Sequence, residues 1–364
     1  MINYKFKAAK AFFGGRISKF MLIIVFICLM LPVAGCRRNG YTSVVRVYTS
    51  KNCFSYSLVE EFEKKNNIKV LYKVFKNADE MWEVLKNSPE LCDVVIGPQY
   101  VLSYFAENNL LAPVDKDKIP NLSLADSLYA DFISDEEKKY YSVLFFEVLG
   151  ILYNKSLVLE GGVNWDTLWD IKYSRQIIMP DNAIDLMNTA LKTLGFSINT
   201  KSYVEIKKAM QKILSQKEMV DAYNKVGIKS KFQNAEAVIA AIRSTDAIKL
   251  MEDLPQVDFN FIIPHQGTNM DFHTVGIMDS SKRKGDCMKF INYLYSTEVS
   301  SKLTEYTNLS FVNKESKKAF LSSDSKFSDI FYPPSYVMER CEIFKSYENM
   351  VYERNKSFNQ VTAM

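Results

Sequence analysis

Histidine is scarce in this 364-residue sequence and occurs only at positions 265 and 273. A serine or cysteine hydrolase needs a base beside its nucleophile. Cys53 with His273 is the only pair that the sequence offers, and no local motif supports it. The motifs GxxxxGK(S/T), GxGxxG, HExxH and GxSxG are absent, so phosphate-cradling, zinc-protease and nucleophile-elbow sites lack their signatures. We therefore expect no enzyme activity, no cofactor and no metal ion.

Acidic residues are absent from the first 35 positions, which hold five basic residues. An uncharged run over residues 20–31 follows and leads to Pro32-Val33-Ala34-Gly35-Cys36. This order is typical of a secretory signal, and Val-Ala-Gly-Cys resembles the bacterial lipobox, in which the cysteine carries the lipids. We predict a lipoprotein signal over 1–35 and a Cys36 lipid anchor in the periplasm or cell envelope. A transmembrane anchor is the alternative. A membrane span usually needs about 20 apolar residues, and the run over 20–31 is shorter.

No basic patch remains once the signal is removed. Its five lysines and arginines reduce the 46 basic residues to 41, against 42 acidic ones, so the mature chain carries a net charge of −1. We therefore expect no nucleic-acid partner. Hydrophobic content of 48% with 24% charged residues is typical of a well-cored globular protein, and the length suffices for two domains.

The cysteines form no CxxC pair, which leaves zinc and thioredoxin-like sites without support. Four of them follow position 36: Cys53, Cys92, Cys287 and Cys341. The sequence leaves open whether these form disulfides or stay buried thiols. Cys53 follows a predicted strand and Cys92 precedes one, so we expect these two at opposite sheet edges and unpaired.

Strands and helices alternate from Val44 onward. Strands are predicted at 44–50, 68–74 and 92–97, and the helices between them place Leu58, Val59, Phe62, Met81, Trp82 and Leu85 inward. The third strand is almost wholly apolar, as a parallel strand covered on both faces should be. This order predicts a β-α-β-α-β unit with a parallel sheet and right-handed crossovers.

The apolar run 143–154 is too long for one exposed strand, and we interpret it as the chain crossing into a second lobe. Strands at 176–179 and 257–264 and helices at 203–214 and 235–243 are expected there. The strand 273–278 and the helices 286–295 and 299–304 would return to the first lobe. We predict a two-lobe α/β fold with these parts: lobe 1 over 44–145 plus 272–330, lobe 2 over 146–271, and a C-terminal tail over 331–364 packing on both.

A strand-to-helix turn at Pro180 holds the most suggestive polar residues. Asp181 and Asn182 end the predicted strand and open an amphipathic helix that Gly195 stops. The carboxyl ends of strands in open α/β sheets face the ligand crevice. Asn182 is also a good N-cap, and Asp185 nearly completes a capping box. Both roles stay open.

Five stretches carry a resemblance to a known family. They read EEFEKKNNIKVLYKVFKNADEMWEVLK, CDVVIGPQYV, NLLAPVDKDKIPN, NWDTLWDIKYSRQIIMPDNAIDLMNTALKTLGFS and MKFINYL. Together they resemble the bacterial spermidine/putrescine-binding proteins, the periplasmic components of polyamine ABC importers. The likeness runs from about Val44 to Tyr295 and implies a two-lobe type II periplasmic binding fold, mainly parallel sheets and a permease in the membrane as partner.

The resemblance also implies a ligand site. In the family, aromatic rings hold the methylene chain of the polyamine and carboxylates meet its ammonium groups. Five residues of this chain stand at positions that match the family pocket or replace its residues: Tyr100, Asp181, Asp185, Asp271 and His273. Residues 50–53 lack two family aromatics and include Lys51, and Arg243 stands at an expected helix position where the family has a stacking tryptophan.

We therefore expect a lipid-anchored binding protein of an ABC importer, with a polyamine or related amine as ligand. Two alternatives stay open. The first alternative is a relative of these proteins that binds another small ligand, because Lys51 and Arg243 suit an acidic or zwitterionic one. A surface interaction protein that keeps the fold is the second.

Overall fold

The computed structural model describes residues 40–345 except 131, 135 and 159–161, together with 354–356, 358–360 and 362. The predicted signal and Cys36 lie outside the described residues. The chain divides into the units Met1–Thr42 and Ser43–Met364, and the elements below all belong to the second. Within the described part of the chain, no helix has the length and apolarity that crossing a membrane requires.

The predicted β-α-β-α-β unit is confirmed. Three parallel strands lie in the order β2-β1-β3. They are β1 (Ser43–Thr49), β2 (Ile68–Val74) and β3 (Val94–Pro98), and α2 (Tyr56–Asn66), α3 (Ala78–Asn87) and α4 (Gln99–Glu107) follow them. The Ser55 side chain caps α2 by accepting from the Leu58 N–H, and Asn67 ends it in the left-handed region. Local capping thus sets these boundaries.

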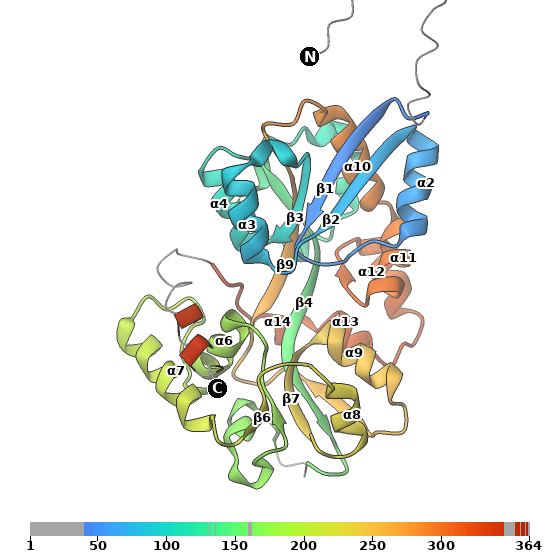
Figure 1. The fold of residues 1–364 in the computed structure, drawn as a ribbon. Coiled ribbons are helices and arrows are strands. Elements are labelled where there is room, and N and C mark those ends of the chain that lie inside the picture. Colours follow the sequence, from blue (N-terminus) through green and yellow to red (C-terminus); the bar gives the residue numbers. More distant parts are fainter. Residues whose placement is uncertain are drawn as a thin grey trace, which may run out of the picture. The chain divides into compact units, whose positions relative to one another are not determined.

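The apolar run forms one long strand, β4 (Tyr141–Asn154), that extends through both lobes (Figure 1). Its first part pairs with β9 (Met270–Ile277) and β10 (Ser310–Phe311), and its last part with β7 (Ile239–Arg243) and β8 (Phe259–Ile262), always antiparallel. The lobe boundaries predicted at 145/146 and 271/272 fall inside β4 and β9, and they stay a prediction.

The second lobe is built on β5 (Ile177–Ile178) and β6 (Val220–Ala222), which extend the sheet beyond β7, with α6 (Ala183–Thr193) and α7 (Tyr203–Gln216) beside them. Asn182 is the N-cap of α6, since its side chain accepts from the Asp185 N–H at 2.8 Å. Trp165 is fully buried in this lobe's core and donates its indole N–H to the Gly267 carbonyl at 2.8 Å.

The helix predicted over 235–243 is wrong. The chain forms the strand β7 there, after α8 (Ile228–Gln233) and before α9 (Ser244–Asp253). Ala235 adopts a positive φ of 56°, which breaks the helix. The residues from Ala237 to Ile242 are all buried. A strand covered on both faces has no polar alternation, so periodicity could not separate it from a buried helix.

The predicted helices near 286–295 and 299–304 are found as α10 (Lys284–Leu294) and α11 (Thr297–Thr307). The chain then forms three shorter helices, α12 (Lys314–Leu321), α13 (Ser328–Phe331) and α14 (Ser335–Met338). Short helical turns complete the fold: η1 (Pro89–Leu91), η2 (Lys116–Lys118), η3 (Pro120–Leu124), α5 (Ser127–Ala130), η4 (Glu137–Lys139), η5 (Trp165–Trp169) and η6 (Ile171–Tyr173).

The four cysteines in the described residues are free and buried: Cys53, Cys92, Cys287 and Cys341. Cys53 follows β1 and Cys92 precedes β3, an adjacent parallel strand, so their side chains lie toward opposite strand ends. Burial raises the pKa of the Cys53 and Cys287 thiols to about 12 in each case. Burial therefore disfavours the reactive thiolate form of these cysteines.

Candidate functional site

A cavity of about 450 Å³ lies where β4 and β9 pass from one lobe to the other. Side chains from both lobes line it, and the five residues predicted from the sequence are all among them: Tyr100, Asp181, Asp185, Asp271 and His273. The tertiary structure thus brings together residues far apart along the chain. That they bind a ligand stays a prediction.

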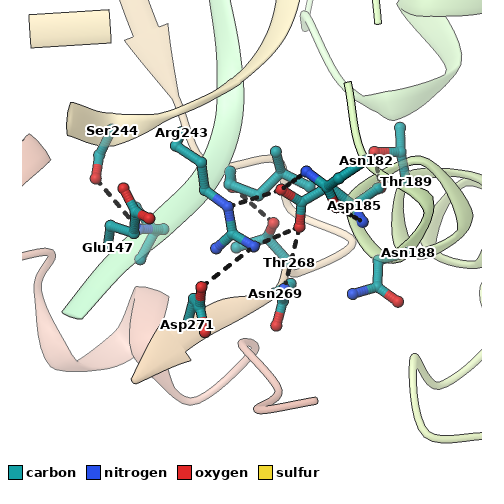
Figure 2. A network of polar contacts seen from close by, with 12 residues as sticks. Glu147, Asn182, Asp185, Asn188, Thr189, Arg243, Ser244, Thr268, Asn269 and Asp271 are labelled. Atoms are coloured by element: carbon teal, nitrogen blue, oxygen red, sulfur yellow. Dashed lines mark hydrogen bonds and ion pairs between the residues drawn. The ribbon is translucent and has the colours of Figure 1, made fainter. Parts of the chain in front are cut away.

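Asp185 and Arg243, both residues of the cavity lining, form a two-point ion pair (Figure 2). The Arg243 Nε donates to Asp185 Oδ2 at 2.8 Å, and the Nη2 donates to Oδ1. The same carboxylate accepts from the side-chain amides of Asn182 at 3.0 Å and Asn269 at 3.3 Å. The Asp185 residue is only 2% exposed. Its carboxylate therefore already has a full set of partners inside the protein.

Asp271 and His273 project from β9 beside this pair. The Arg243 Nη2 lies 3.8 Å from Asp271 Oδ2, and the His273 Nε2 lies 3.4 Å from the same oxygen. The His273 ring stacks on Phe145, with ring centroids 4.7 Å apart. Burial alone would raise the pKa of Asp271, but His273 and Arg243 together hold it below its ordinary value. Asp271 is consequently a carboxylate with two neighbours and an open side toward the cavity.

Glu147 is a cavity residue that the sequence analysis missed. The Lys51 ammonium contacts both of its carboxylate oxygens at 2.6 Å, and the Thr245 hydroxyl donates to one of them at 2.7 Å. Burial would raise the pKa of Glu147, but Lys51, Arg243 and His273 hold it well below its ordinary value. One signal could have found it, because it is the only charged residue in the apolar run 143–153.

Tyr100 and Asp181 differ in their exposure to solvent. Tyr100 lies in the first turn of α4, where burial and the charge of Asp79 hold the pKa of its phenol well above the usual range, so the phenol stays neutral. Asp181 lies at the exposed rim, 3.5 Å from the Lys225 ammonium, which is itself 2.9 Å from Asp246. Tyr100 can thus contribute a ring and a hydroxyl, and Asp181 a solvated charge.

The lining has more negative than positive side chains. Six carboxylates face four cationic groups: Asp79, Glu147, Asp181, Asp185, Asp246 and Asp271 against Lys51, Lys76, Lys225 and Arg243. The excess of two negative charges favours a cationic ligand group. The innermost carboxylates, however, are already paired with Lys51 and Arg243, so a ligand ammonium meets carboxylates that the protein has partly neutralised.

One group of described residues has the ligand types of a metal site, namely Glu147, Asp271 and His273. Both carboxylates already contact a cationic side chain, Lys51 in one case and Arg243 in the other. A divalent ion there would be repelled by both cations and would have to displace the ammonium that lies 2.6 Å from Glu147. We assign no metal to this group.

Replacing Glu147 with glutamine should lower the free energy of unfolding by about 2 kcal/mol at neutral pH, since a buried charge pair is broken while Lys51 stays partly solvated. The folded pKa of Glu147 lies below the unfolded value of about 4.3. Its contribution is therefore present above that pH and is lost as the pH falls further. Urea unfolding from pH 7 to pH 3 should give a flatter profile for Glu147→Gln. Glu218→Gln is the control, because the Glu218 side chain is 88% exposed, and an equal flattening there would contradict the prediction.

The sequence and the fold match those of known bacterial solute-binding proteins. The family model for bacterial extracellular solute-binding proteins matches residues 57–328. The spermidine/putrescine-binding periplasmic protein 1 of Haemophilus influenzae is 25% identical over 299 residues, covering 81% of this chain and 82% of that protein.

Solved structures show the same fold. The spermidine/putrescine ABC transporter substrate-binding protein PotD of Streptococcus pneumoniae gives a TM-score of 0.76 at 22% identity, covering 88% of this chain and 99% of that one. The TpPotD lipoprotein of Treponema pallidum gives 0.76 at 19% identity, covering 88% and 100%.

The two-lobe periplasmic binding fold expected from the sequence is thus confirmed, and so is the resemblance to the polyamine-binding proteins. The family consists of transport receptors, which confirms that the chain is not an enzyme. Because the match spans more than half of the sequence, the chain belongs to the family of bacterial extracellular solute-binding proteins.

Proposed function

We propose that this chain captures a small amine in the cavity between its lobes and delivers it to the membrane permease of an ABC importer. The carrying observation is the set of six carboxylates against four cationic groups around a cavity of about 450 Å³. Polyamines are the first class to consider, because the names of the relatives specify spermidine and putrescine. Asp271 is the residue best placed to meet a ligand ammonium, since its side chain remains 22% exposed.

A second candidate ligand class is a zwitterionic or acidic solute. Arg243 and Lys51 support it, because these two basic side chains lie in the innermost part of the cavity. A ligand carboxylate beside them would gain charge-assisted hydrogen bonds. A triply charged amine has less to gain there, since burying each ammonium requires a carboxylate or ring face that is not already occupied.

A thermal-shift and calorimetry panel tests the proposal with the mature protein. The probes are putrescine, spermidine, 4-aminobutyrate and glutamate. A bound probe at about 100 times its dissociation constant should add roughly 2.7 kcal/mol to the free energy of unfolding. Asp271→Asn should weaken the binding of an amine at least tenfold. Asp258→Asn should leave amine binding unchanged, because this carboxylate is 58% exposed and pairs with Lys155 outside the cavity. Millimolar amines without any effect would contradict an amine-binding function.

Hydrogen exchange separates a solute receptor from a surface interaction protein with the same fold. Closure of the lobes on a ligand should slow exchange in the two chain crossings, at 143–147 and 263–271, because these segments carry the relative motion. The measurement compares the free protein with protein saturated by the best probe of the panel. Slowing confined to the lobe interiors would count against a closing cleft.

We further propose that Cys36 carries a lipid anchor. The sequence Val-Ala-Gly-Cys after an apolar run supports it, and the Treponema pallidum neighbour is described as a lipoprotein. Cys36→Ser should shift the protein from the detergent phase to an uncleaved or soluble form, measured by phase partition and by mass. Cys53→Ser is the matched control, because that buried thiol belongs to the folded body. An unchanged membrane fraction and mass for Cys36→Ser would refute the anchor.

A further inference from the structure

The C-terminal segment 339–345 reaches the cavity from the side of the second crossing. The Glu342 N–H donates to the Thr268 carbonyl, and the Met270 N–H donates to the Glu342 carbonyl, both at 2.9 Å. These two bonds form a short parallel bridge at Asn269. The segment therefore runs beside the chain crossing that enters β9.

Side chains fasten the same segment to the second lobe. The Glu342 carboxylate pairs with Lys192 of α6 and accepts from the Ser197 hydroxyl. The Asn199 side chain forms two further bonds, donating to the Ile343 carbonyl at 2.8 Å and accepting from the Lys345 N–H at 2.7 Å. Three residues of the second lobe thus hold Glu342, Ile343 and Lys345, on both sides of Phe344.

The Phe344 side chain packs against Ile198 and Ile184 of the second lobe and also meets the first lobe. Its ring contacts the Tyr100 ring edge-on, with centroids 5.5 Å apart and planes at 73°. The Arg354 guanidinium lies 4.4 Å from the centroid of the Phe344 ring. Phe344 lines the cavity and is 4% exposed. The segment therefore connects α6 in one lobe with the start of α4 in the other.

Rings are few in the cavity lining. Among the described lining residues, only Tyr100, His273 and Phe344 carry an aromatic ring. One face of the His273 ring is covered by Phe145. Tyr100 and Phe344 thus form the aromatic wall of the cavity. An amine with a chain of methylene groups needs such a wall, because its alkyl part loses water contact on binding.

From these contacts we propose that Phe344 is a ligand-contacting residue, which with Tyr100 packs against the methylene chain of the amine and links the two lobes through the C-terminal segment. The proposal rests on the proposed amine-binding function and adds a residue beyond the stretch of family resemblance. Phe344 in the segment 339–345 would then discriminate the chain length of the amine, while the carboxylates discriminate its charge.

The binding test uses 1,3-diaminopropane, putrescine and cadaverine, which carry the same charges on chains of increasing length. Phe344→Ala should raise the dissociation constant of cadaverine about five- to thirtyfold and that of 1,3-diaminopropane less. The ratio of the 1,3-diaminopropane constant to the cadaverine constant should therefore fall. Phe344→Tyr should restore the ratio. Phe327→Ala is the control, because Phe327 is comparably buried at 7% exposure and is not among the cavity residues.

A second measurement needs no ligand. Unfolding midpoints of Tyr100→Ala, Phe344→Ala and the double variant form a cycle, and the double variant should lose less than the sum of the two single losses. Additive losses, or an affinity ratio that Phe344→Ala leaves unchanged, would overturn the proposal. A wild-type protein that binds no diamine would contradict the proposed function instead, and the cycle would still decide the link between the lobes.

Discussion

Asp185→Asn is expected to lower the free energy of unfolding by about 3 kcal/mol, because it leaves the Arg243 guanidinium without its main counter-charge in a buried site. The Arg243 side chain is only 13% exposed, and its next carboxylate, Asp271, lies 3.8 Å away. An N-cap contribution alone would be on the order of 1 kcal/mol. Urea unfolding of the mature protein at neutral pH measures the difference.

A double variant decides whether the loss comes from the unpaired arginine. Arg243→Met combined with Asp185→Asn should recover much of the stability, since both charges are then removed together. Asp181→Asn is the matched control at the same turn and should cost less than about 1 kcal/mol, because its ion pair with Lys225 is at the surface. A stable Asp185→Asn protein that has lost amine binding would show instead that Asp185 serves the ligand and not Arg243.

Gly267→Ala should destabilise the protein by roughly 3 kcal/mol or more. Gly267 has a φ of 79°, a left-handed conformation that costs an L-residue about 1 kcal/mol or more. A Cβ atom there would also overlap the carbonyl oxygen of Arg340, a backbone atom that cannot rotate away. The Gly267 carbonyl further accepts from the Trp165 indole. Thermal and urea unfolding measure the loss.

Gly285→Ala provides the control for that prediction. Gly285 lies in α10, its missing Cβ would meet nothing within 4 Å, and alanine favours a helix by about 0.5–1 kcal/mol. This variant should be as stable as the wild type or slightly more stable. If Gly267→Ala behaved like Gly285→Ala, the close approach of residues 267 and 340 would be wrong, and the anchoring of segment 339–345 at the second crossing would be in doubt.

Residues whose environment is local were predictable. Asn182 caps α6 as its spacing to Asp185 indicates, and the strands 44–50 and 68–74 agree with β1 and β2 within one residue. The helix wrongly predicted over 235–243 concerns residues whose environment is set by distant parts of the chain. Ile239 and Ile242 are buried because other layers cover both faces of β7, so the local pattern did not reveal the period of a strand.

The site divides in the same way. The presence of Lys51 and Arg243 where the family has aromatics was visible in the sequence, and so was the suitability of these cations for an acidic group. Their partners were not, because the Lys51–Glu147 pair spans 96 residues and the Arg243–Asp185 pair spans 58. Phe344 entered only with the fold, since the family resemblance ends well before it.

By itself, the sequence thus determined the family, the order of most strands and helices, and the five polar and aromatic residues that line the cavity. Only the tertiary structure decided that Asp185 and Glu147 face cations of the protein itself, and that the C-terminal segment supplies an aromatic ring. The physical reason is the range of the interactions. Caps and alternating burial act over a few residues, whereas an ion pair or a ring contact depends on which strands the sheet brings side by side.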